Sequence, residues 1–222
     1  MKTHTSLSAA GALSLALLAS LPAHAATTVL NEGFNDVTAL EGWSQYNYSY
    51  PQGQGWLQGN AGQFDAQSGS ADSFVATSFL SASNGIGSVD SWLILPLLNL
   101  TGTTLLSFFS RSVGSPGFND MLEVRFDQGP GTFDTLLATI GAYAAYPDSW
   151  TAFSATLNVE GSGRFAFRYL GDADALDYIG IDTVSVMTCV PEPSSWLMLA
   201  LGTAGVAGVA TRRRRTSSPL LS

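Results

Sequence analysis

The chain has 222 residues, nine basic and seventeen acidic, with a formal net charge of −8. Residues 26–189, which we call the body, contain four arginines, no lysine and sixteen acids. The body therefore lacks the positive charge needed to bind phosphate backbones, which excludes nucleic acid as a partner. Both histidines precede residue 26 and the single cysteine is Cys189. These counts exclude Ser-His or Cys-His catalysis, histidine zinc sites and a disulfide framework within the body.

The first 25 residues have the pattern of a signal peptide. Lys2 precedes an Ala- and Leu-rich run at residues 7–21, and Ala23 and Ala25 supply the small-x-small pattern that signal peptidase cuts. We expect cleavage after Ala25. The alternative is an uncleaved membrane helix, which the shortness of the apolar run disfavours.

Between the two ends, short stretches of alternating apolar and polar residues are separated by breakers such as Asn84-Gly85, Pro96 and Gly161 to Gly163. Eight stretches predict strands: residues 29–34, 74–79, 91–95, 103–111, 121–127, 150–157, 164–170 and 178–186. No helix is predicted, and residues 41–72 form the longest irregular segment. The pattern indicates one all-β sandwich domain over residues 26–189.

Three segments of the body are distinctive: SWLILP at residues 91–96, RFAFRY at residues 164–169 and YIGIDTV at residues 178–184. Together with their flanking strands they resemble choice-of-anchor J and cleaved-adhesin domains over most of residues 29–187. The resemblance implies a jelly-roll β-sandwich, similar to MAM domains and other galactose-binding-like modules. It also implies a surface or matrix protein in a family with few enzymatic activities.

Two carboxylates are predicted to point to the same face of their strands as the apolar side chains: Glu32 in the first predicted strand and Asp182 in the last. A buried carboxylate is costly unless it is paired or bound to a cation. In jelly rolls of this resemblance the first and last strands are adjacent, so Glu32 and Asp182 can approach one ion, with Asp36 as a further ligand. Oxygen ligands favour Ca²⁺, and we expect a structural calcium ion here. The alternative is that both acids reach water or an arginine.

The densest acidic cluster, at residues 171–177, fails the spacing of an EF-hand loop. Asp177 stands where that loop needs glycine, and Thr183 stands where it needs a bidentate acid. We expect a solvated loop.

Residues 46–56 mix aromatic side chains with amides and glycines. Aromatic faces stack on sugar rings while amides bond hydroxyl groups, so we expect carbohydrate contact at Tyr46, Tyr48, Tyr50 and Trp56. The alternative is that these side chains pack onto the edge of the sandwich. We assign the other tryptophans of the body to the core: Trp43, Trp92 and Trp150.

The C-terminal region has three parts in order: Val190, Pro191, Glu192 and Pro193, then an apolar stretch at residues 196–211, then Arg212, Arg213, Arg214 and Arg215. As a transmembrane helix the apolar stretch spans about 24 Å, slightly less than a bilayer core of about 30 Å. Snorkelling arginines and interfacial Trp196 offset the difference. The arginines place residues 216–222 in the cytoplasm and the body outside the inner membrane.

This order of parts resembles the PEP-CTERM sorting tail. The resemblance implies a Gram-negative bacterium in which an exosortase-type enzyme recognises the tail and removes it. The alternative is a permanent C-terminal anchor.

We therefore expect an exported, non-enzymatic adhesive or structural protein of the cell surface or of an exopolysaccharide or biofilm matrix. Its expected partners are signal peptidase, an exosortase-type enzyme, glycans and, before processing, the membrane. A carbohydrate-binding module is the alternative. A polysaccharide hydrolase is less favoured, because no spacing singles out a pair of catalytic carboxylates.

Overall fold

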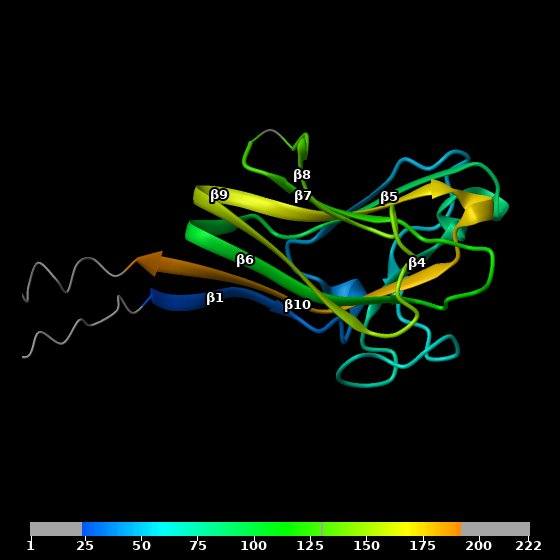
Figure 1. Ribbon diagram of the computed structural model, residues 1–222, viewed down its shortest axis with the longest axis horizontal. Coiled ribbons are helices and arrows are strands. Elements are labelled where there is room, and N and C mark those ends of the chain that lie inside the picture. The colour runs from blue at the N-terminus through cyan, green and yellow to red at the C-terminus, as the bar shows by residue number, and fades with distance from the viewer. Residues whose placement is uncertain (1–23, 130, 192–222) are drawn as a thin grey trace, which may run out of the picture.

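A computed structural model describes residues 24–129 and 131–191, in which ten strands form a sandwich of two antiparallel sheets (Figure 1). The strands are β1 (His24–Glu32), β2 (Ser44–Asn47), β3 (Leu57–Gln58), β4 (Val75–Ser78), β5 (Ser88–Ile94), β6 (Leu98–Ser112), β7 (Leu122–Asp127), β8 (Thr135–Ile140), β9 (Thr151–Asp172) and β10 (Tyr178–Pro191). Four short 3-10 helices join them: η1 (Val37–Ala39), η2 (Phe79–Ser81), η3 (Ser83–Gly85) and η4 (Ala173–Ala175). The all-β sandwich predicted from the sequence is confirmed.

Sheet A is built around β10. One edge of β10 pairs with β6. The first part of its other edge pairs with β4 and the second part pairs with β1, and β3 pairs with β4. Sheet B has the order β2-β5-β9-β7-β8. Because His24 pairs with Pro191, both described ends of the chain leave the same end of the sandwich, at the left of Figure 1.

Strand β9 belongs to both sheets. Residues 151–163 pair with β6 in sheet A, and residues 164–172 pair with β5 and β7 in sheet B. The sequence predicted two strands with a break at Gly161 to Gly163, and this is wrong: β9 is one strand of 22 residues. Gly161 has φ of 101°, a conformation open to glycine, so the chain crosses between the sheets here without ending the strand.

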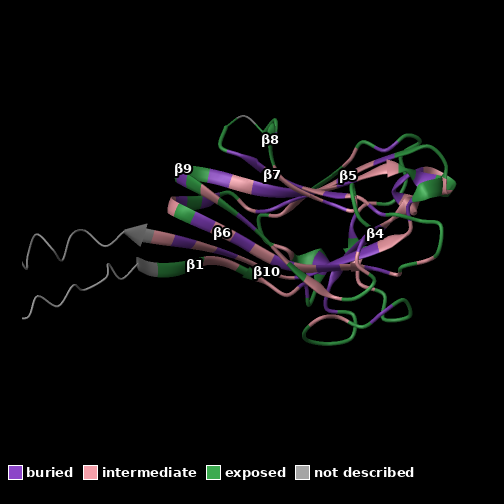
Figure 2. Cartoon of the chain, in the orientation of Figure 1, coloured by how far each residue is buried: buried purple, intermediate pink, exposed green. Residues whose placement is uncertain are grey.

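The interior of the sandwich is filled from both sheets by the alternation read in the sequence, and Figure 2 shows buried residues spaced along β6, β9 and β10. Phe167 of β9 packs edge-on against Phe108 of β6, with ring centroids 4.8 Å apart. A fully buried side chain of this kind contributes about 1.5–3 kcal/mol to stability.

The predicted irregular region at residues 41–72 contains two short strands, β2 and β3, which the sequence did not predict. Beyond β3 the chain packs onto β4 and β10 through a second aromatic cluster in which Phe64 lies 5.0 Å from Phe74 and 5.5 Å from Trp150. Trp150 Nε1 donates a hydrogen bond of 2.8 Å to the backbone oxygen of Asp65. Trp43 packs against the main core, so both tryptophans have the packing role expected of them.

Within the described residues no helix is long and apolar enough to cross a membrane. The predicted transmembrane helix at residues 196–211, the arginine cluster and the signal peptide up to Ala23 all lie outside the described residues.

Candidate functional site

A cavity of about 460 Å³ lies on the outer face of sheet B. Its lining comes from four parts of the chain: Tyr46 and Tyr48 in and after β2, Trp92 and Ile94 on β5, Gly131 to Phe133 between β7 and β8, and Arg164 on β9. This volume is within the range of about 300–1,000 Å³ found for small-molecule sites.

Tyr46 and Tyr48 form one wall of the cavity. Residues two apart in an extended segment project from the same face, and the two rings stack with centroids 6.2 Å apart and planes only 6° from parallel. They are 51% and 66% exposed, so most of this aromatic surface faces solvent. Pairing of β2 with β5 sets Tyr46 opposite Trp92, which brings a third aromatic ring to the site.

Phe133 forms the opposite wall. The loop between β7 and β8 folds back over sheet B and buries this side chain against Ile94 and Ala166. The Phe133 ring lies 5.7 Å from the Trp92 ring, tilted by 49°. A third, small hydrophobic cluster thus lies on the outside of the sandwich, and the cavity opens at the margin of this cluster.

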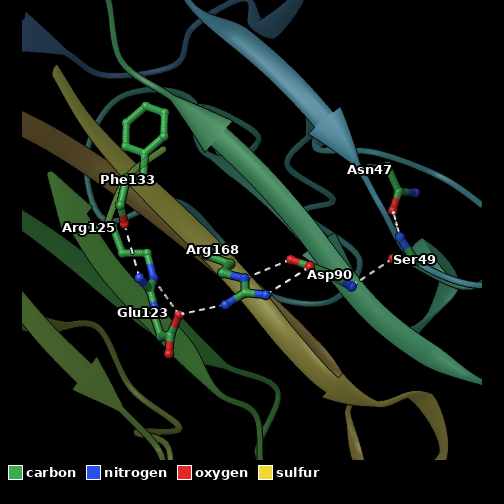
Figure 3. A network of polar contacts seen from close by, with 7 residues as sticks. All are labelled: Asn47, Ser49, Asp90, Glu123, Arg125, Phe133 and Arg168. Carbon is green, nitrogen blue, oxygen red and sulfur yellow. Dashed lines mark hydrogen bonds and ion pairs between the residues drawn. The ribbon is translucent and has the colours of Figure 1, made fainter. Parts of the chain in front are cut away.

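A polar network beside the cavity fixes both walls (Figure 3). Arg168 donates two hydrogen bonds of 2.8 Å to the Asp90 carboxylate and one of 3.3 Å to Glu123. These bonds with Asp90, more than any other interaction, raise the pKa of Arg168. The same guanidinium lies 5.0 Å from the centre of the Trp92 ring, so its fixed position also holds the indole. Glu123 accepts a 2.7 Å bond from Arg125.

The network reaches the walls at both ends. Arg125 Nη1 donates to the backbone oxygen of Phe133 at 3.0 Å, which ties the covering loop to sheet B. At the other end, Ser49 Oγ accepts from the backbone N–H of Asp90 at 2.9 Å, and Asn47 Oδ1 accepts from the N–H of Ser49 at 2.9 Å. Tyr48, which lies between Asn47 and Ser49, is therefore anchored to β5, and Tyr46 is held by the pairing of β2 with β5.

Two donors at the cavity have no hydrogen-bond partner in the described structure, Trp92 Nε1 and Arg164 Nε. Leaving a buried donor unpaired costs about 1–3 kcal/mol. Four other buried atoms are also unpaired, on Trp56, Ser91, Thr104 and Asp177, but none of these residues lines this cavity. Both atoms are covered by protein, so what the cavity offers a ligand is its aromatic faces and the rest of the Arg164 guanidinium.

The structure divides the four residues predicted to contact carbohydrate. Tyr46 and Tyr48 line the cavity, whereas Tyr50 is exposed but is not part of its lining. Trp56 is only 2% exposed and packs in the main core, so the prediction that it contacts a ligand is wrong. Its backbone N–H donates to Gln45 Oε1 at 3.0 Å, which holds the chain just before β3 close to β2.

Sequence reasoning missed Trp92, Phe133 and Arg164. Trp92 was assigned to the core, but it lies on the outer face of sheet B. A signal was present, because Trp92 shares its phase along β5 with Asp90 rather than with buried Leu93. No local pattern predicted that Phe133 would fold over the sheet.

Asp182, the first candidate calcium ligand, is fully buried as its phase predicted. Its Oδ2 accepts a hydrogen bond of 3.0 Å from the backbone N–H of Ser68, and its Oδ1 accepts from the N–H and hydroxyl of Thr183. Burial raises the pKa of the Asp182 carboxyl, and these hydrogen bonds oppose that effect. None of these partners is a cation, so an oxygen-binding ion is chemically compatible with this group.

The other two candidates have separate local roles. Glu32 Oε1 accepts from the backbone N–H of Phe34 at 2.7 Å, at the end of β1 beside β10. Asp36 is exposed and caps η1, and its bonds with the hydroxyl and N–H of Thr38 lower the pKa of its carboxyl. The described residues contain no group of three or more His, Cys, Asp or Glu side chains arranged to hold a metal ion. Calcium bound by Glu32, Asp182 and Asp36 stays a prediction.

The acidic segment at residues 171–177 is exposed at Asp172 and Asp174 and contains η4. The prediction of a solvated acidic loop is confirmed for these two side chains.

Residues 190–215 match the PEP-CTERM protein-sorting motif, which marks an exported protein for sorting at the membrane. The fold is similar to the K3 cleaved adhesin domain of Lys-gingipain from Porphyromonas gingivalis, with a TM-score of 0.59 and 20% identity over 74% of this chain and 99% of that domain. The K1 cleaved adhesin domain of the same protein gives a TM-score of 0.53 and 23% identity, covering 72% and 97% of the two chains. No curated protein matches the chain. At these identities the likeness shows the fold alone, so the chain joins a PEP-CTERM sorting motif to a β-sandwich with the cleaved-adhesin fold.

Proposed function

We propose that this chain is a non-enzymatic surface protein that binds glycans through the cavity on sheet B. The observation that carries the proposal is the stacked pair of Tyr46 and Tyr48, which lines a cavity of about 460 Å³ together with the neighbouring Trp92. Sugar rings present apolar faces that pack on aromatic side chains, and hydroxyl groups that accept from donors such as the Arg164 guanidinium.

The chemistry of the lining supports binding without catalysis. Glycoside hydrolysis generally needs two carboxylates that flank the scissile bond, and the side chains that line the cavity include no carboxylate. The nearest acids of the network, Asp90 and Glu123, are already bonded to arginines. The site can hold a sugar, but it offers no pair of groups for general acid and base catalysis.

The sorting motif supplies the location in this proposal. An exosortase-type enzyme processes the tail after export and signal-peptide removal, and the body then acts as an adhesive component of the exopolysaccharide or biofilm matrix of a Gram-negative bacterium. Glycan binding is the activity that retains it there. Assignment of the body to the choice-of-anchor J group is part of the same proposal.

The test is glycan-array binding by the purified full chain, followed by titration of the strongest ligand. The double variant Tyr46→Ala with Tyr48→Ala removes one wall, and we expect its affinity to fall at least about tenfold, since aromatic side chains dominate binding energies. Tyr143→Ala is the matched control, because Tyr143 is fully exposed and lies outside the cavity. Unchanged affinity in the double variant would remove the cavity from the proposal. A wild-type chain that binds no glycan would overturn it.

A further inference from the structure

The cationic side chain at the cavity indicates which glycans it takes. We propose that the site selects sugars carrying a carboxylate, and that Arg164 binds this group. The inference rests on the proposed glycan binding and narrows it to uronate-containing glycans.

Arg164 differs from the other arginines of the body in its partners. Arg125 and Arg168 form ion pairs with Glu123 and Asp90. Arg111 donates to the backbone oxygens of Ser112 and Asp148 and lies 4.3 Å from the ring centre of Phe64. Arg164 makes no ion pair and no hydrogen bond through its side chain among the described residues; its guanidinium lies 5.8 Å from the Phe133 ring centre.

The acid that pairs with Arg164 in the strand register is hydrogen-bonded to another group. Asp127 of β7 pairs with Arg164 of β9 in the ladder, but it is buried, and its Oδ2 accepts the N–H of Gly131 at 2.9 Å. No acid is among the residues that line the cavity. Although the body has sixteen acids for four arginines, within its described part Arg164 is left without an ion pair beside an aromatic cavity whose lining includes no acid.

Charge and shape together identify the ligand class. A carboxylate forms charge-assisted hydrogen bonds with a guanidinium, which are about twice as strong as neutral ones. A free inorganic anion would leave Tyr46 and Tyr48 without a role, whereas a uronate supplies both a ring to stack and a carboxylate.

The experiment compares each oligouronate with its own methyl ester, because esterification removes the charge and keeps the sugar. The full chain is titrated by calorimetry with oligomers of galacturonate, glucuronate and mannuronate. We expect at least one acid form to bind about tenfold more tightly than its ester, equivalent to about 1.4 kcal/mol. Arg164→Gln should bring the affinity for the acid down to that for the ester, with the ester affinity unchanged.

Two further variants make the result specific. Arg164→Lys keeps the charge and should retain part of the preference for the acid. Arg111→Gln removes a cation outside the cavity and should retain the full preference. Unfolding curves confirm that each variant is folded.

The possible failures point to different conclusions. Equal affinity for acid and ester would overturn the selectivity for carboxylates and leave glycan binding intact. A preference that survives in Arg164→Gln would overturn the role of Arg164. Binding to no sugar of either form, and to no glycan on the array, would overturn both the selectivity and the proposed function.

Discussion

Phe167 and Ala166 are neighbours on β9, both fully buried, yet they are covered in different ways. Phe167 faces inward and is covered by sheet A, where Phe108 meets it. Ala166 faces outward and is covered by Phe133 from a loop. A sheet closes the inner face continuously, whereas the loop closes only part of the outer face and leaves a cavity at its margin. The way a face is covered, more than its composition, separates the core from the candidate site.

The largest expected effect tests the inner face. Phe167→Ala removes a buried ring from between the sheets and should lower the free energy of unfolding by about 3–5 kcal/mol. Urea denaturation of the variant and the wild type measures the difference. Glycan affinity of the folded variant should be unchanged, because Phe167 does not line the cavity. A loss below about 1 kcal/mol would show that the interior is less tightly packed than the structure indicates.

A calcium ion at Asp182 would make the comparison less sharp, because the interior of the sandwich would then bind a ligand as well as the outer face. If the ion binds the folded chain alone, a concentration one hundred times its dissociation constant adds about 2.7 kcal/mol to stability. Calorimetric melting with calcium and with chelator measures this effect. Asp182→Asn should abolish the shift, and Asp174→Asn, a change at an exposed acid, should preserve it. A melting temperature that is the same with calcium and with chelator refutes the ion.

A pair of tryptophan variants sharpens the comparison. Trp92→Phe replaces the indole that lines the cavity with a smaller ring, so glycan affinity should fall about fivefold, or about 1 kcal/mol, with little change in stability. Trp150→Phe removes the donor bonded to Asp65 and should lower stability by about 1 kcal/mol, with affinity unchanged. Titration and urea denaturation of both variants give the two quantities. The same pattern in both variants would count against a distinct role for Trp92.

The smallest expected effect concerns buried Asp120, which accepts hydrogen bonds from the Tyr169 hydroxyl and the backbone N–H of Asp177. Burial is the main cause that raises the pKa of Asp120 above its ordinary value of 3.8. The folded chain therefore holds this proton more tightly than the unfolded chain, and its contribution to stability declines as pH rises above that value. Asp120→Asn lacks this titration, so its stability relative to the wild type should increase from pH 3.5 to pH 7, measured by urea denaturation. A constant difference across this range would contradict the raised pKa.

Alternation in the sequence predicted the inner face well, and β7 is an example. Leu122, Val124 and Phe126 are buried while Glu123 and Arg125 between them are partly exposed, as the period of two requires. Edge strands were harder to predict. β2 reads Ser-Gln-Tyr-Asn without an apolar alternation, so its strand conformation depends on pairing with β5.

The sequence by itself determined two properties of this protein, the β-sandwich and the C-terminal sorting motif. Both depend on local sequence patterns: the sandwich on a repeated alternation of apolar and polar side chains, and the sorting motif on a linear order of residues. Only the tertiary structure decided that Tyr46, Trp92, Phe133 and Arg164 share one cavity, because they come from four distant segments. Strand register and a folded-back loop bring them together, and both depend on long-range contacts that no local pattern contains.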